Sequence, residues 1–207
     1  MIVKELIDDL SNVCESYLSE EEQIYTSKEW NKFDKNKVCD IAARNGWLDL
    51  LQWARLNISQ AKWDSNSTVC SSAALNGHLH IIKWARENGC NWDKYTCSES
   101  VKKGHLEVLK WAHENGCEWS SMTCNFAAYF GQLEVLKWAR LNGCNWSEYT
   151  CSNAALNGHL EVLKWAKLNG CDWSINACYF AFSNNHLEVL KWLKLNGCVC
   201  GGEYYKD

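Results

Sequence analysis

Apolar and polar positions recur along the chain with a period of 27 residues. The stretch from Thr150 to Asn176 reads TCSNAALNGHLEVLKWAKLNGCDWSIN, and similar stretches begin 27 and 54 residues before it. The same step separates five tryptophans (Trp84, Trp111, Trp138, Trp165, Trp192) and five cysteines (Cys90, Cys117, Cys144, Cys171, Cys198). A fixed period of this size indicates a solenoid of short units. What recurs in every copy is then scaffold, and the function is expected where copies differ.

Each copy predicts two helices. In the best-defined copy, a short helix over 148–157 follows the N-cap candidate Ser147, and Gly158 ends it. A second helix is predicted over 159–168, and the Asn-Gly pair after it stops it. Its apolar residues cover more than half of its circumference, which suits a helix between neighbours on both sides. The N-cap candidates of the other copies are Asp64, Asp93, Ser120 and Ser174.

The ends of the chain depart from the period. Residues 2–18 form one amphipathic pattern, and we expect this helix to cap the array, whose end copy otherwise exposes an apolar face. Residues 38–57 are a degenerate first copy, and four extra residues around Trp63 separate it from the next. The predicted organisation is a capping helix and connector over 1–36, six repeats over 37–200 and a frayed tail over 201–207.

The composition is ordinary for a globular protein, at 47% hydrophobic and 22% charged residues. The net charge of −4 gives no basic footprint, so no nucleic-acid partner is expected. No long apolar run and no signal-like N-terminus occur, so we expect a cytoplasmic protein without a membrane partner. We also expect no cofactor and no enzyme activity, because phosphate-loop, nucleophile-elbow and zinc-protease motifs are missing.

The 13 cysteines have two interpretations. Their odd number and the missing signal peptide argue against a disulfide framework. Cysteines seven residues apart, such as Cys90 and Cys97, would form zinc sites if they met those of a neighbouring copy. The favoured interpretation is that they are buried as small apolar side chains. A zinc-binding repeat array remains the alternative.

The 13 tryptophans also have two interpretations. A regular ladder of indoles is a stacking platform for single-stranded nucleic acid in some proteins. Units this short have few other large side chains, so we favour tryptophan as the buried contact between repeats. A single-strand binder that uses the Trp ladder remains the second alternative.

Two further series are interpreted as structural. A histidine follows the turn glycine or asparagine in four copies and a glutamine in a fifth (His78, His105, His159, His186, Gln132). A hydrogen-bonding role tolerates both residue types, whereas general-base catalysis does not. Lysines at the 27-residue step follow a glutamate by three residues in four copies, as in Glu161 and Lys164, so the charges cancel on a solvated face.

The segment ALNGHLEVLKWAKLNGCDW resembles the helix-turn-helix half of an ankyrin repeat, in which AAxxGHxxxVxxLLxxGA occupies the same positions. The period of 27 instead of about 33 implies a shortened loop, and the Thr-Pro-Leu-His opening is missing. Over residues 38–198 the Cys- and Trp-rich pattern is similar to the ankyrin-like repeats of giant DNA virus proteins. The resemblance implies an all-α, right-handed solenoid that binds a protein, and a viral origin would place it in host cytoplasm or nucleus.

The first helices diverge most between copies, and the resemblance places them on the concave side of the array. Aromatic residues replace the small or aliphatic residues of other copies at Phe126, Tyr129, Phe130, Tyr179, Phe180 and Phe182. The copy before them is charged, at Glu99, Lys102 and Lys103. Clustered exposed aromatics are typical of interface hot spots, so we predict partner binding there. The alternative is that several of these rings fill gaps between neighbouring helices.

Overall fold

The computed structural model describes residues 36–57, 68–92 and 95–200, and every regular element in these ranges is an α-helix. The predicted capping helix, the insertion around Trp63, the N-cap candidates Asp64 and Asp93, and the tail lie outside the described residues and stay predictions. The chain divides into two compact units on either side of Asp93 and Lys94. Each unit is a stack of helix pairs, which confirms the predicted all-α repeat architecture.

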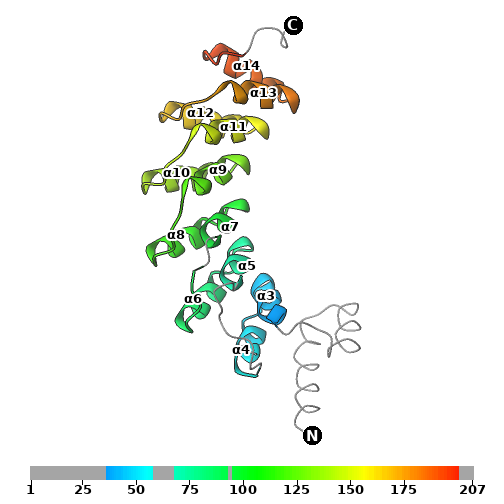
Figure 1. Ribbon diagram of the computed structural model, residues 1–207, viewed down its shortest axis with the longest axis vertical. Helices are drawn as coiled ribbons and strands as arrows, with labels where there is room; N and C mark the ends of the chain where they lie inside the picture. The colour runs from blue at the N-terminus through cyan, green and yellow to red at the C-terminus, as the bar shows by residue number, and fades with distance from the viewer. Residues whose placement is uncertain (1–35, 58–67, 93–94, 201–207) are drawn as a thin grey trace. The chain divides into compact units, whose positions relative to one another are not determined.

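The described part of the first unit contains two helix pairs (Figure 1). Its helices are α3 (Asn36–Asn45), α4 (Leu48–Asn57), α5 (Val69–Leu75) and α6 (Leu79–Glu87). Helix α3 packs against α4 within its pair and against α5 of the next pair, and α5 packs against α6.

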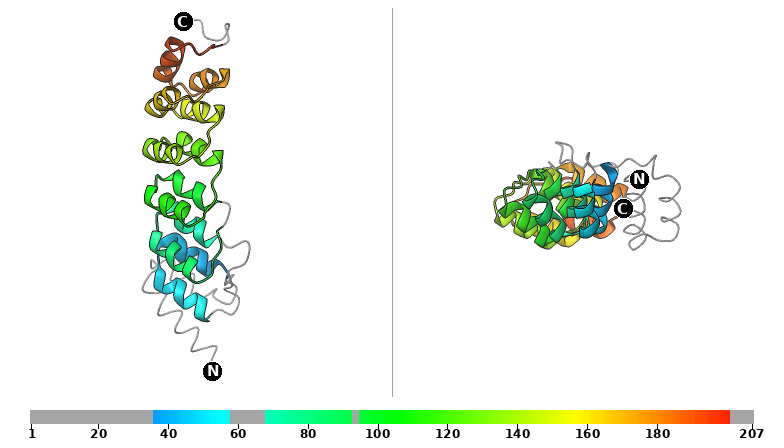
Figure 2. Two further views of the ribbon diagram at one scale, coloured as in Figure 1. Left: turned by 90° about the vertical axis from the view of Figure 1, so that its left-hand side faces the viewer. Right: turned by 90° about the horizontal axis from the view of Figure 1, so that it is seen from below.

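Residues 95–200 of the second unit form four helix pairs. Its helices are α7 (Thr96–Lys102), α8 (Leu106–Glu114), α9 (Ser121–Tyr129), α10 (Leu133–Leu141), α11 (Glu148–Leu156), α12 (Leu160–Leu168), α13 (Ile175–Ser183) and α14 (Leu187–Leu195). Within the unit the pairs lie one upon another, as Figures 1 and 2 show from two sides. The first helices α7, α9, α11 and α13 pack side by side from each repeat to the next. They form a continuous row.

Local signals in the sequence fix the helix ends. Ser120, Ser147 and Ser174 are N-caps with extended backbone, as predicted, and Ser147 forms a capping box with Thr150. The first helix of that repeat ends at Leu156, one residue before the predicted end, and Gly158 follows with φ +74°. This left-handed conformation favours glycine because it has no Cβ.

The core of each repeat consists of small and branched side chains. In the fifth repeat, Ala154 and Ala155 of α11 and Leu163 and Ala166 of α12 have no exposed surface. The equivalent positions of the neighbouring repeats are also buried, including Ala127, Ala128, Leu136 and Ala139. Part of the apolar pattern predicted for the second helices is therefore core, as Val162, Leu163 and Ala166 show.

Candidate interaction surface

The tryptophans connect successive repeats of the second unit. The Trp146 ring, in the loop after α10, lies 5.8 Å from the Trp165 ring on α12 in an edge-to-face arrangement. The pairs Trp119–Trp138 and Trp173–Trp192 repeat this contact at 5.5 and 5.7 Å. Edge-to-face packing is favourable because the positive ring edge meets the negative ring face. The predicted contact between repeats is confirmed.

The described tryptophans are half-buried and not fully buried, so they lie at the rim of the core. Each loop indole lies beneath a residue of the helix before it. The Arg140 guanidinium is 4.5 Å from the Trp146 ring centre, and the Lys167 ammonium is 4.2 Å from the Trp173 ring centre. Such cation–π contacts cover an indole while leaving the cation hydrated. The tryptophans therefore belong to a packed edge that joins the repeats.

His78, His159 and His186 each join a repeat to the preceding one, as their structural interpretation predicted. The Nε2 atom of His105 is buried and has no hydrogen-bond partner among the described residues. His159 Nε2 lies 3.1 Å from the Tyr129 carbonyl oxygen, and His186 Nε2 lies 3.0 Å from the Leu156 carbonyl oxygen. These carbonyls are at the ends of first helices, where no helical partner remains. A Cβ added to Gly158 would stand 2.7 Å from the His186 ring, so the histidine requires a glycine beside it.

The cysteines form pairs within a repeat, 20 residues apart. The Cys97 and Cys117 sulfurs are 2.7 Å apart, and the Cys70 and Cys90 sulfurs are 3.6 Å apart. Each pair joins the first helix to the loop after the second helix. Burial raises the pKa of the Cys39 thiol to about 11, as expected for a thiol used as an apolar side chain.

The sequence argued against a disulfide framework, and the described residues contain a single disulfide. Cys178 of α13 is bonded to Cys200, beyond α14, and the thiol of Cys198 lies beside them. Among the described residues, these three sulfurs are the one group of three or more potential metal ligands. The described residues therefore do not build a metal site in each repeat, which the alternative of a zinc array requires.

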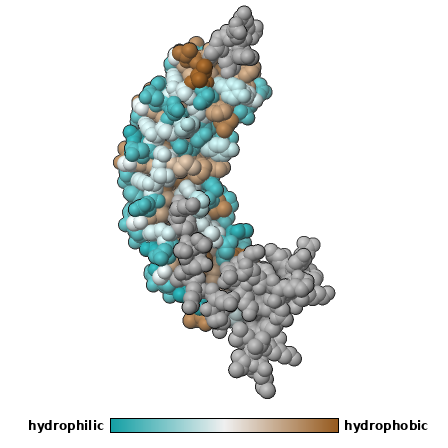
Figure 3. Space-filling model, in the orientation of Figure 1, coloured by the Kyte–Doolittle hydropathy of each residue, from teal (hydrophilic) through white to brown (hydrophobic). Residues whose placement is uncertain are grey.

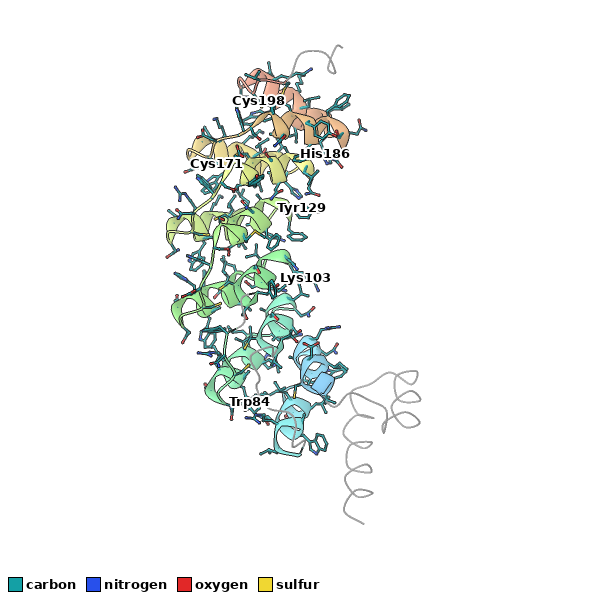
Figure 4. All side chains as sticks on the ribbon, viewed as in Figure 1. Trp84, Lys103, Tyr129, Cys171, His186 and Cys198 are labelled. Atoms are coloured by element: carbon teal, nitrogen blue, oxygen red, sulfur yellow. A yellow bond between two sulfur atoms is a disulfide. The ribbon has the colours of Figure 1, made fainter. Side chains whose placement is uncertain are left out.

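Aromatic side chains project from the row of first helices where the sequence predicted them. Tyr129 and Phe130 are 37% and 36% exposed, with ring centres 4.8 Å apart. Phe126 is half-buried, and its ring centre is 6.2 Å from that of Phe130. The three rings therefore form one cluster at the end of α9. Figure 4 shows Tyr129 pointing away from the ribbon on the side of the first helices, whereas Cys171 and Cys198 lie on the side of the second helices.

A second pair of rings lies on α13. Tyr179 is 56% exposed, and its ring centre is 5.7 Å from that of the half-buried Phe180. Phe182 is 45% exposed on the same helix. Helix α11 lies between α9 and α13 and carries no aromatic residue after Tyr149. The predicted aromatic residues thus form two groups, on α9 and on α13.

The charged residues of α7 are close to the α9 group. Lys102 Nζ is 2.6 Å from a carboxylate oxygen of Glu99 and 5.7 Å from the Phe126 ring centre. Lys103 follows as an exposed residue. The opposite charges of Glu99 and Lys102 largely cancel in this ion pair. The surface beside the rings is therefore polar but carries little net charge from these two residues.

A cavity of about 530 Å³ lies between α7 and α9. Its lining includes Glu99, Lys102 and Phe126, together with three residues that the sequence analysis missed: Tyr95, Trp119 and Met122. Tyr95 and Met122 are about half exposed and occupy equivalent positions before the Thr-Cys pair. The large side chain at this position in three successive copies was the signal that could have revealed them. On the face that Figure 3 shows, hydrophobic residues form separate patches among hydrophilic ones.

Comparison with known proteins agrees with a helical-repeat architecture. Residues 97–140 and 151–193 match the family model of ankyrin repeats (many copies). The crystal structure of the human ASB11 ankyrin repeat domain is similar with a TM-score of 0.63 and 16% identity, over 77% of this chain and 83% of that one. No match appears among curated proteins. Residues 97–140 and 151–193 are therefore similar to ankyrin repeats, as the sequence indicated, and the solved structure shares the fold.

Ankyrin repeats are generally non-catalytic scaffolds for protein–protein interaction. No helix in the described part of the chain has the length and apolarity needed to cross a membrane. The likeness to giant-virus repeats stays a prediction, because nothing in the fold tests it.

Proposed function

We propose that the row of first helices in the second unit binds a protein partner, and that the rings of Phe126, Tyr129 and Phe130 are its central contact. One observation carries the proposal. At the positions of these three residues the neighbouring repeat has Asn153, Leu156 and Asn157, while the alanines that fill the core are the same in both repeats.

The surroundings of these side chains support a packing role for the alanines and a binding role for the rings. Ala127 and Ala128 already occupy the buried positions of α9, so Tyr129 and Phe130 keep more than a third of their surface exposed. Exposed aromatic rings bury a large area on binding at a small cost in side-chain entropy. The cavity beside Phe126 offers a recess for a partner side chain, and the polar groups of Glu99 and Lys102 line it.

The α13 residues Tyr179 and Phe180 extend the proposed surface, and Lys103 supplies an exposed charge near its other end. The resemblance to ankyrin arrays supports this choice, because such arrays present their first helices on the concave side. If the resemblance to giant-virus repeats holds, the partner is a host protein. The mechanism is binding by a preformed surface, with no chemical step.

The test is affinity capture from cell lysate with two baits, wild type and Phe126→Ser/Tyr129→Leu/Phe130→Asn. The substituted residues copy Ser72, Leu75 and Asn76, which the fold accepts at the same positions. We expect recovery of the partner to fall about tenfold or more, because each hot-spot residue contributes about 2 kcal/mol or more.

A matched control changes an exposed hydrophobic residue elsewhere. Leu141 is 84% exposed at the end of α10, so Leu141→Asn removes surface apolarity without touching the first helices. This bait should recover the partner like wild type. Equal recovery by the triple variant, or loss with Leu141→Asn instead, would place the contact elsewhere and refute the proposal.

A further inference from the structure

Three cysteine sulfurs meet at the C-terminal repeat. Cys178 lies on α13, and Cys198 and Cys200 follow α14, so two helices and a Cys-Val-Cys segment bring them together. Their sulfur atoms all lie within 4.8 Å of one another. In the preceding repeats the fold brings two sulfurs together, 20 residues apart, and Cys200 is the addition that makes a group of three.

The three thiols differ in their access to solvent. Cys178 has no exposed surface and Cys198 is 6% exposed, whereas Cys200 is half-buried at the rim. Val199, between the last two, is 80% exposed, so the segment that carries Cys200 runs along the surface. A small ion therefore has a path to the buried sulfurs past Cys200.

The distances suit a single ion. A metal–thiolate bond is about 2.3 Å long, so sulfurs bound to one ion lie at most about 4.6 Å apart. The Cys178 and Cys198 sulfurs are 3.2 Å apart, and no two sulfurs of the group are more than 4.8 Å apart. The three sulfurs therefore need to move only slightly to bind one ion. The Cys178–Cys200 disulfide must first be reduced. A dithiol or a phosphine supplies the two electrons, and each sulfur takes one proton to become a thiol.

Ser174 lies beside the group of sulfurs. The Ser174 hydroxyl is buried and has no hydrogen-bond partner among the described residues, while its own carbonyl oxygen lies 3.9 Å from the Cys198 sulfur. The equivalent hydroxyls of Ser120 and Ser147 are partnered, by Met122 and Asn125. A buried hydroxyl without a partner costs free energy, so this repeat keeps a polar group that its described residues do not use.

We propose that the reduced Cys178, Cys198 and Cys200 thiols bind one thiophilic d¹⁰ ion, for which Cu(I) is the best fit. Soft thiolate ligands select Cu(I) and Zn(II), but structural zinc almost always takes four protein ligands. The described residues offer three, a number that Cu(I) accepts. Each thiol loses its proton on binding, and the disulfide form has no site, so the oxidation of this pair controls metal binding.

The proposal is tested by titrating the whole chain, reduced with a phosphine, with Cu(I) held by a competing chromogenic chelator. We expect one ion per chain, and none when the disulfide is left intact. Cys200→Ser should bind about a hundredfold more weakly or worse, because the loss of an outer partner alone costs about 10–100-fold. A parallel titration with Zn(II) should show weaker binding than Cu(I).

The control is Cys171→Ser, which removes a thiol that pairs with Cys151 in a repeat where the described residues supply no third sulfur. It should bind copper like wild type, with both variants checked for helicity by circular dichroism. Cu(I) should also protect Cys200 from alkylation in the wild type, a readout that needs no variant. The proposal is overturned if the reduced wild type binds no copper, if Cys200→Ser binds it equally well, or if several ions bind and Cys171→Ser removes one.

Discussion

In the second unit the four second helices begin with the same six residues, LEVLKW, whereas the four first helices share a cysteine alone. Both kinds of helix bury one side in the core. The second helices carry in addition a tryptophan that meets the loop indole of the preceding repeat. Their sequence is therefore constrained by packing on both flanks. The first helices keep a face on which packing sets no requirement.

The outer arc of the second helices is uniform as well. Lysine and glutamate three residues apart form ion pairs in three repeats, at 2.8, 2.8 and 2.7 Å. Identical, self-neutralised surfaces offer a partner nothing to distinguish one repeat from another. The comparison favours the first helices, whose exposed residues vary, as the place of the proposed recognition.

The largest effect is expected in the constrained helices. Leu163 is fully buried on α12, and Leu163→Ala should lower the free energy of unfolding by about 2–5 kcal/mol through lost burial and a cavity. Leu168 on the same helix is 84% exposed, so Leu168→Ala should change it by less than about 0.5 kcal/mol. Urea unfolding followed by circular dichroism measures both. Similar losses for the two variants would show that α12 is not held as described.

Two turn glycines allow the effect of the contact between repeats to be measured apart from the effect of the left-handed backbone conformation. Gly158 and Gly170 both have positive φ, but an added Cβ would meet the His186 ring at Gly158 and nothing within 4 Å at Gly170. Gly170→Ala should cost about 1–2 kcal/mol from the left-handed conformation alone. Gly158→Ala should cost about 1 kcal/mol more, from a displaced histidine. Equal thermal unfolding of the two variants would mean that the histidine contact contributes nothing.

A double-mutant cycle on Trp146 and Trp165 measures the coupling free energy of the tryptophan contact that joins two repeats. We expect a coupling free energy of about 0.5–1.5 kcal/mol, the usual size for an edge-to-face aromatic pair. The cycle compares both single alanine variants and the double variant by urea unfolding. Additive losses would indicate that the two indoles stabilise the repeats independently.

The smallest effect on stability is expected on the solvent-exposed side of the second helices. Glu161 and Lys164 form an ion pair with the glutamate side chain 73% exposed, so a double-mutant cycle should give about 0.5 kcal/mol or less. The coupling should fall further in 1 M salt, which screens exposed charges. A coupling as large as that of the tryptophans would reverse the ranking.

The regular parts of the fold could be predicted because local chemistry repeats with the sequence. Ser147 and Gly158 mark the ends of α11 by capping and by φ, which depend on single residues. The tryptophans were harder, since their exposure depends on which residue of another repeat faces them. Arg140 covers Trp146, and no sequence pattern states that contact.

The same limit applies to the candidate site. Tyr129 and Phe130 stood out because they break the repeat, while Tyr95 and Met122 conform to it and were missed. The cysteine pairs also escaped prediction. Cys97 and Cys117 are separated by a whole helix, and their contact follows from the way α7 packs on the loop after α8.

The central claim is that the rings of α9 serve recognition and not packing. The most direct measurement is the urea unfolding of Phe126→Ser/Tyr129→Leu/Phe130→Asn beside wild type. The claim predicts a free energy of unfolding within about 1 kcal/mol of wild type, because the buried alanines remain and surface changes cost little. A loss of about 2–5 kcal/mol, the size expected for Leu163→Ala, would show that the rings fill the space between first helices and would contradict the account.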